Sequence, residues 1–106
     1  MDFRRVKEIA IRFFQELRRN NLTPDLVVLF GSHAKGKPNK NSDIDIAVVS
    51  RKFGKDRSKE ITFLNKIAYQ IDPSIEAIPI NTFDYIAKET TSPILNEIKK
   101  SGVVIV

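Results

Sequence analysis

Residues 26–49 of the chain, which read LVVLFGSHAKGKPNKNSDIDIAVV, decide its fold. The stretch begins with an apolar run over residues 26–30 that is rich in β-branched side chains and too short for a stable helix, so it predicts a buried strand. Gly31 and Ser32 follow, and a glycine at this position lets the backbone turn sharply. We expect a short helix over residues 32–36, whose first free N–H groups would face an anion.

Two acidic residues, Asp43 and Asp45, stand at the start of a second predicted strand. Side chains alternate faces along a strand, so both carboxylates project to one side with their Cα atoms about 6.5 Å apart, and Ile44, Ile46 and Val48 face the core. Two carboxylates at this spacing can converge on a pair of divalent ions, an arrangement used for displacement at phosphorus. Such a pair alone is more often a solvated strand end, and it is the preceding turn that favours metal binding.

The combination of Gly31-Ser32 with Asp43-x-Asp45 resembles the signature of the DNA polymerase beta-like nucleotidyltransferase superfamily. The run Gly-Ser-x-Ala-Lys-Gly is similar to that of its minimal nucleotidyltransferase branch, in which arginine is usual where this chain has Lys35. Residues 96–105 also resemble the end of these proteins. The resemblance therefore covers nearly the whole chain, and we expect a single minimal nucleotidyltransferase domain over residues 1–106, of the MntA antitoxin type.

This resemblance implies a catalytic set of three acids, Asp43, Asp45 and Glu76, which would hold two Mg²⁺ ions. Glu76 is the only acid in an apolar third strand, where a carboxylate without a partner costs free energy. Aspartate is commoner than glutamate at this position in the family. The alternative is a glutamate on an edge strand that points to solvent.

The resemblance also implies a triphosphate site for ATP at Gly31, Ser32 and Lys35. The two residues of the turn would bind through backbone N–H groups and the serine hydroxyl, and Lys35 would reach a phosphate oxygen. Lys35 fits the role of an ordinary surface lysine equally well. The arginine that is usual at this position binds phosphate through a planar fork, which a lysine cannot reproduce. His33 occupies a variable position of the motif, and we interpret it as a surface residue without a role.

The other segments predict the rest of the fold. In chain order we expect a helix over 2–20, strands over 26–30 and 43–49 joined by an exposed loop over 37–42, a helix over 57–71, a strand over 74–80, helices after Thr82 and over 93–101, and a strand over 103–106. This order predicts an α+β domain of two layers, in which a mixed β-sheet is packed with helices, as in the nucleotidyltransferase fold. The order of the strands does not follow from the sequence.

The net charge of +5 is unevenly distributed. Residues 1–60 contain 14 Lys or Arg against 8 Asp or Glu, and residues 61–106 contain 4 against 5. A basic half suits a triphosphate, a nucleic-acid backbone or an acidic protein, and it also fits ordinary solvated helix faces. The absence of cysteine and of any long apolar run leads us to expect a soluble cytoplasmic protein with no membrane partner.

Family resemblance implies that the protein transfers AMP from ATP to a hydroxyl and releases pyrophosphate. Minimal relatives commonly act as antitoxins beside an all-helical HEPN toxin and adenylylate one of its tyrosines, so we expect a Mg²⁺-dependent protein adenylyltransferase with such a partner. One alternative is a catalytically weak or inactive antitoxin that masks its partner sterically. Another is a nucleic-acid-binding module, which we do not favour because the chain contains no RNA- or DNA-binding motif.

Overall fold

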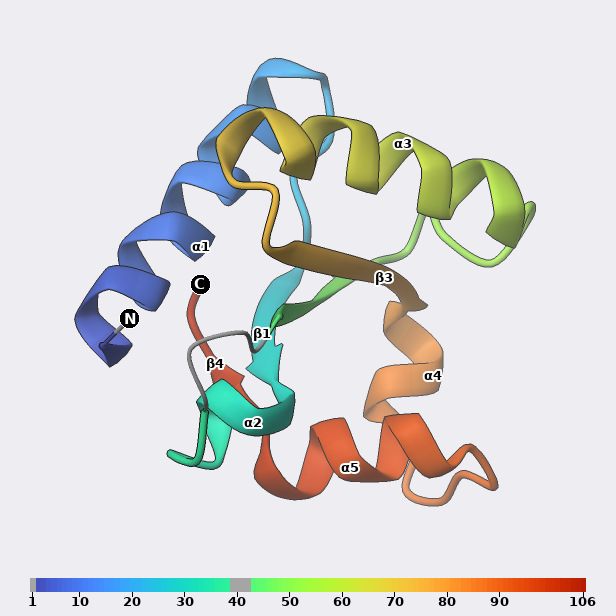
Figure 1. Cartoon of the computed structure of the whole chain (residues 1–106). Helices are drawn as coiled ribbons and strands as arrows, with labels where there is room; N and C mark the ends of the chain where they lie inside the picture. Colours follow the sequence, from blue (N-terminus) through green and yellow to red (C-terminus); the bar gives the residue numbers. More distant parts are fainter. Residues whose placement is uncertain (1, 39–42) are drawn as a thin grey trace.

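A computed structural model describes residues 2–38 and 43–106, and in it four strands form one mixed sheet of order β3-β2-β1-β4. The strands are β1 (Leu26–Phe30), β2 (Ile44–Ser50), β3 (Ile75–Asn81) and β4 (Val103–Val104). Strand β1 pairs antiparallel with β2 and β4, and β2 pairs parallel with β3. The predicted α+β fold with a mixed sheet is confirmed, and helices cover both faces of the sheet (Figure 1).

Two long helices, α1 (Phe3–Arg19) and α3 (Arg57–Ile71), cover one face of the sheet. Each begins at an aspartate, Asp2 or Asp56, whose side chain accepts a hydrogen bond from a backbone N–H of the first turn. The apolar side chains that recur along α1 from Val6 to Leu17 are buried, and they pack against the side chains that β1 and β2 direct to this face. This is the larger of the two apolar cores because two whole helices contribute to it.

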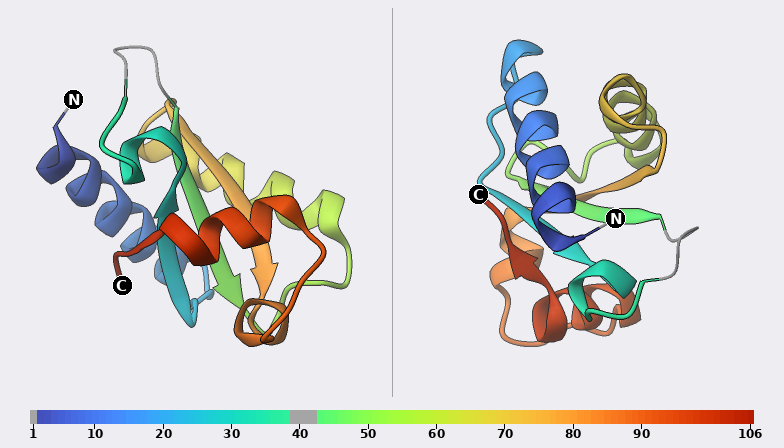
Figure 2. Two further views of the ribbon diagram at one scale, coloured as in Figure 1. Left: turned by 90° about the horizontal axis from the view of Figure 1, so that it is seen from below. Right: turned by 60° about the vertical axis from the view of Figure 1, so that its left-hand side comes forward.

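The other face of the sheet carries α2 (Gly31–Ala34), α4 (Thr82–Ile86) and α5 (Pro93–Ser101). Figure 2 shows α5 lying across the strands, with α2 at the end of β1. Helix α5 begins at Ser92, whose hydroxyl accepts from the Leu95 N–H, and its Leu95 and Ile98 pack on this face of the sheet. Helix α5 therefore covers part of the sheet face that carries the acids.

Strand register decides which acids share this face. Asp45 lies opposite Phe30 of β1 on one side and opposite Glu76 of β3 on the other. The neighbours of Asp45 along β2, Ile44 and Ile46, are fully buried in the larger core, as their alternation predicted. Since the side chains of paired residues point to the same face, Asp45 and Glu76 both project toward the α2 and α5 side.

The outer edge of β3 is closed by side chains of α3. Asn65 donates to the Ala77 carbonyl at 2.8 Å and accepts from the Ala77 N–H at 2.9 Å, as a neighbouring strand would. Arg57 donates to the carbonyl of Pro79 at 3.2 Å, and Pro79 has no N–H to satisfy. Edge strands with free backbone groups invite pairing with other chains, and here helix α3 removes that opportunity.

Several element boundaries differ by one or a few residues from those predicted. Strand β2 begins at Ile44, so Asp43 precedes the strand instead of opening it. Strand β4 contains only Val103 and Val104, although the next residue, Ile105, still donates its N–H to the Val27 carbonyl. Of the predicted loop, Lys37 and Pro38 are exposed and residues 39–42 lie outside the described part. In the described chain, no helix combines the length and the apolar character needed to cross a membrane.

Candidate active site

The turn after β1 is built around Gly31, which lies directly against the carboxylate of Asp45. Its φ of +73° is a conformation that residues with a side chain rarely adopt. A Cβ atom placed on Gly31 would lie 2.2 Å from Asp45 Oδ2 and 3.1 Å from its Cγ. Glycine is thus required here both by the backbone and by the acid, and the structure brings the predicted turn and the predicted acid together.

Asp45 is the electrostatic centre of the site. Burial, together with the nearby charges of Glu76, Asp43 and Glu97, raises the pKa of Asp45 from its ordinary 3.8 to about 6, and His33 acts in the opposite direction. Asp45 is half-buried, whereas Asp43 and Glu76 are exposed. Asp43 and Glu76 therefore stand close enough to Asp45 to repel its charge, and both are exposed to solvent.

The chemistry of these side chains suits a hard divalent cation. Carboxylate oxygens are the donors that Mg²⁺ prefers, and a cation would offset both the burial and the repulsion that raise the pKa of Asp45. In the described part of the chain, however, no three acidic or imidazole side chains are already arranged as a metal site. The shared negative charge around Asp45 is the feature that favours a cation here.

Lys35 lies just beyond α2 and forms an ion pair with Glu97 of α5. The Nζ–Oε1 distance is 2.6 Å, and both side chains are partly exposed. The backbone N–H of Lys35 donates to the Gly31 carbonyl at 3.2 Å, so the lysine is tied to the turn. The prediction placed Lys35 near the phosphates, and the structure places it one helical turn from Gly31 with its ammonium on an acid of another helix.

Two residues at this site, Glu97 and His33, had no role in the sequence analysis. The interpretation of His33 as a surface residue was wrong, because only 7% of it is exposed. Its helix, α2, packs against both β1 and β2. No feature of the sequence marks Glu97 as a site residue, since its location depends on where α5 crosses the sheet.

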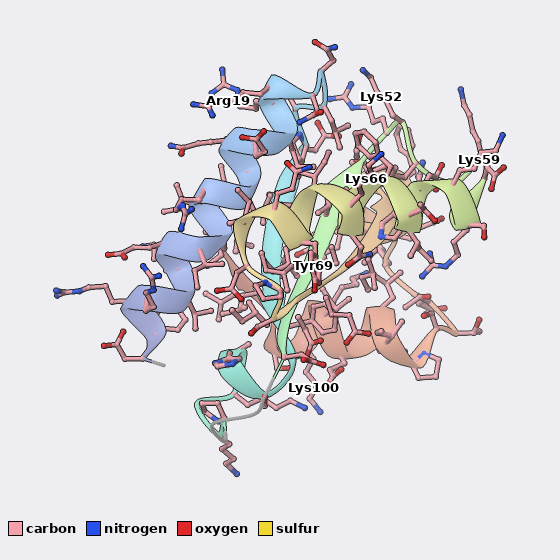
Figure 3. The ribbon with its side chains drawn as sticks, turned by 45° about the horizontal axis from the view of Figure 1, so that its top comes forward. Arg19, Lys52, Lys59, Lys66, Tyr69 and Lys100 are labelled. Carbon is pink, nitrogen blue, oxygen red and sulfur yellow. The ribbon has the colours of Figure 1, made fainter. Side chains whose placement is uncertain are left out.

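Exposed lysines in α3 and in the segment just before it lie away from the acids. Figure 3 shows Lys52 and Lys59 projecting outward into solvent, with Lys66 and Tyr69 on the outer side of α3. Helix α3 packs on the sheet face opposite the one that carries Asp45. Lys52 and Lys59, which belong to the basic half of the sequence, therefore lie outside the site, and Lys59 fits the alternative of a solvated helix face.

A pocket of about 410 Å³ lies at the other end of β3, and none of the predicted site residues lines it. Its floor includes Ile78, Ile80 and Leu95, and Asp84 and Glu89 stand among its polar lining residues. We place the candidate site at the acids nevertheless, because the raised pKa of Asp45 and the turn at Gly31 come together there, and a site that opens to solvent forms no deep cavity.

Comparison with known proteins gives a family and several similar structures. Residues 14–106 match the family described as "Polymerase beta, Nucleotidyltransferase". A chain in the crystal structure of a toxin–antitoxin with AMP-PNP is 25% identical with a TM-score of 0.58, and the match covers 94% of this chain and 72% of that one. A comparison with curated proteins found no match.

Two further solved structures share the fold. A chain in a mutant of the toxin–antitoxin MntA-HpeT is 23% identical with a TM-score of 0.57, over 92% of this chain and 72% of that one. A putative nucleotidyltransferase from Sulfolobus solfataricus is 18% identical with a TM-score of 0.60, over 96% of this chain and 80% of that one.

Proposed function

Because the chain belongs to the polymerase beta nucleotidyltransferase family, we propose that it transfers AMP from ATP to a hydroxyl group and releases pyrophosphate. The observation that carries this proposal is the contact between the turn and the acid: Gly31 leaves room for the carboxylate of Asp45, with Glu76 beside it on the next strand. An anion-binding turn against a cation-binding acid suits a metal–triphosphate complex.

We assign the roles as follows. Asp43, Asp45 and Glu76 would hold two magnesium ions, which when bound neutralise charge on the triphosphate and on the leaving pyrophosphate. Glu76 would accept the proton of the acceptor hydroxyl as its oxygen attacks the α-phosphorus and the bond to pyrophosphate breaks. Its exposed position on an edge strand leaves it accessible to an incoming hydroxyl.

The triphosphate would lie on the turn at the start of α2. The backbone N–H groups and hydroxyl of Gly31 and Ser32 would donate to its oxygens, and Lys35 would add a charge. Positioning and charge stabilisation account for most of the rate enhancement in phosphoryl transfer, and a covalent enzyme intermediate is not required.

For the acceptor, we propose a tyrosine of a HEPN-type helical toxin, with this protein as its antitoxin. The similarity to a chain from a toxin–antitoxin structure with AMP-PNP supports a toxin partner and ATP as the nucleotide. The openness of the site supports a macromolecular acceptor, because a hydroxyl on the surface of a folded protein can reach exposed acids directly.

The test is transfer of labelled AMP to the purified partner in the presence of magnesium. We expect the double variant Asp43→Ala/Asp45→Ala to lose about a thousandfold or more in rate, because it removes the ligands of both ions. Glu8→Gln, an exposed acid on α1, is the charge control and should transfer at the wild-type rate. Transfer that persists in the double variant would overturn the proposal.

A second candidate is a sterically acting antitoxin, favoured by exposed apolar side chains on α4 and the start of α5. Phe83, Ile86 and Ile94 are 64%, 64% and 44% exposed, so this region offers apolar surface to a partner. A masking antitoxin would still neutralise the toxin in cells when it carries Asp43→Ala/Asp45→Ala. An enzyme would not, and a growth assay with the double variant separates the two functions.

A further inference from the structure

The ion pair between Lys35 and Glu97 joins the turn to α5 across the sheet face that carries the acids. The two residues are 62 positions apart in sequence, and their charged atoms are 2.6 Å apart. An ion pair on a protein surface contributes little to stability, so its contribution to the fold does not explain it. Its location beside Gly31 suggests a contribution to the site instead.

Glu97 is held firmly by its own helix. Its neighbours Leu95 and Ile98 are 7% and 1% exposed, and both pack against the sheet. The backbone carbonyl of Glu97 accepts a hydrogen bond from the Ser101 hydroxyl at 3.1 Å, and Ser92 caps the start of α5. The carboxylate therefore extends from a fixed support, whereas α2 is a helix of a single turn.

The flexible side chain of Lys35 is restrained by its ion pair with Glu97. A lysine side chain has four rotatable bonds, and it loses much conformational freedom when a ligand fixes its ammonium. The ammonium has three N–H donors, and one carboxylate oxygen occupies one of them, which leaves two for phosphate oxygens. A carboxylate that already restricts the lysine reduces the entropy lost on binding, as the partners of metal-ligating side chains do.

We propose that Glu97 is a positioning residue, which holds the ammonium of Lys35 where a triphosphate on the Gly31–Ser32 turn receives it. This inference rests on the proposed function, since it requires a triphosphate at the turn. It assigns Glu97 to nucleotide binding and not to the chemical step, because its carboxylate acts through Lys35. It also explains why a residue of α5 belongs to a site otherwise formed by the strands and α2.

The experiment measures the dissociation constant of a non-hydrolysable ATP analogue with magnesium by calorimetry, for Glu97→Gln, Lys35→Ala and the double variant. We expect Glu97→Gln to weaken binding about three- to tenfold. The loss is this small because Glu97 spares only part of the conformational entropy that a lysine loses when it is fixed. In the Lys35→Ala background the same substitution should change nothing. In an assay of AMP transfer, Glu97→Gln should raise KM for ATP and leave kcat unchanged.

Matched variants separate this role from a structural one. Glu89→Gln removes a more exposed glutamate ahead of α5 and should leave nucleotide affinity unchanged. Lys35→Arg keeps the charge and offers a fork that reaches both Glu97 and a phosphate, so it should bind the analogue at least as tightly as the wild type. Thermal unfolding curves of all variants should coincide with that of the wild type.

The possible failures are distinguishable. A wild-type protein that binds no nucleotide would overturn the proposed function and this inference together. Nucleotide binding that is unchanged in Glu97→Gln, or weakened equally with and without Lys35, would overturn this inference alone. Tighter binding in Glu97→Gln would also overturn it, because it would mean that Glu97 competes with the phosphates for Lys35.

Discussion

At the scale of single residues, Gly31 and Gly36 form a natural pair for separating backbone strain from steric conflict. Both have positive φ angles, +73° and +71°. A Cβ on Gly31 would meet the carboxylate of Asp45, whereas a Cβ on Gly36 would have nothing within 4 Å. Alanine at either position incurs the same backbone strain, and only at position 31 must the carboxylate also turn away.

We therefore expect Gly31→Ala and Gly36→Ala each to lose about 1 kcal/mol of unfolding free energy from strain. Gly31→Ala should in addition abolish detectable nucleotide binding, because it displaces Asp45. Urea unfolding and calorimetry of the two variants check this prediction. Equal nucleotide affinity in both variants would mean that the contact between Gly31 and Asp45 is irrelevant to the site.

The raised pKa of Asp45 predicts a stability that depends on pH. The folded protein binds the Asp45 proton more tightly than the unfolded chain does, so between about pH 4 and pH 6 the unfolding free energy falls as pH rises. The shift from 3.8 to about 6 corresponds to at most about 3 kcal/mol, which solvent screening reduces to about 1 kcal/mol for this partly exposed group.

We expect Asp45→Asn to raise the unfolding free energy by about 1 kcal/mol at pH 7.5, in the absence of metal and nucleotide, and to have little effect at pH 4. The reason is that asparagine carries no charge to lose hydration on burial or to be repelled by Glu76. Urea unfolding of both proteins at pH 4, 5, 6 and 7.5 is the measurement. Destabilisation of the same size at every pH would show instead that the carboxylate is needed for packing.

At the scale of elements, the edge of β3 is closed by side chains of α3, and Asn65 bonds both backbone groups of Ala77. Asn65→Ala leaves the N–H and C=O of Ala77 without their partners, and we expect a loss of about 1–3 kcal/mol in unfolding free energy. Gln70→Ala, an exposed position on the same helix, is the control and should cost less than about 0.5 kcal/mol. Urea unfolding measures both variants, and equal losses would contradict the proposed role of Asn65.

The sequence was sufficient for most elements but not for their arrangement. Strand β1 ends where predicted, because Gly31 interrupts an apolar run that has no other way to be buried. The positions of β4 and α5 depend on pairing and packing between segments more than 60 residues apart, which local periodicity does not encode. For this reason the turn and the acids of the candidate site were predictable, whereas Glu97 was not.

At the scale of the whole molecule, a ligand that binds only the folded state should stabilise it. At an ATP concentration of about 100 times the dissociation constant, the gain is about 2.7 kcal/mol. For a domain of this size we then expect the melting temperature to rise by roughly 10 °C or more with magnesium and ATP. The variant Asp43→Ala/Asp45→Ala should show no such rise in differential scanning fluorimetry, and an equal rise would place the nucleotide elsewhere.

The sheet has two unlike borders. At β3 the border is sealed by Asn65, Arg57 and Pro79, and at β4 it ends in a pair of residues hydrogen-bonded only toward β1 within the described chain. Growth of the sheet by an added strand therefore has a single available direction, away from Glu76. Any oligomer that extended the sheet in this way would leave the acids facing outward at its perimeter, and each copy would keep its own entrance.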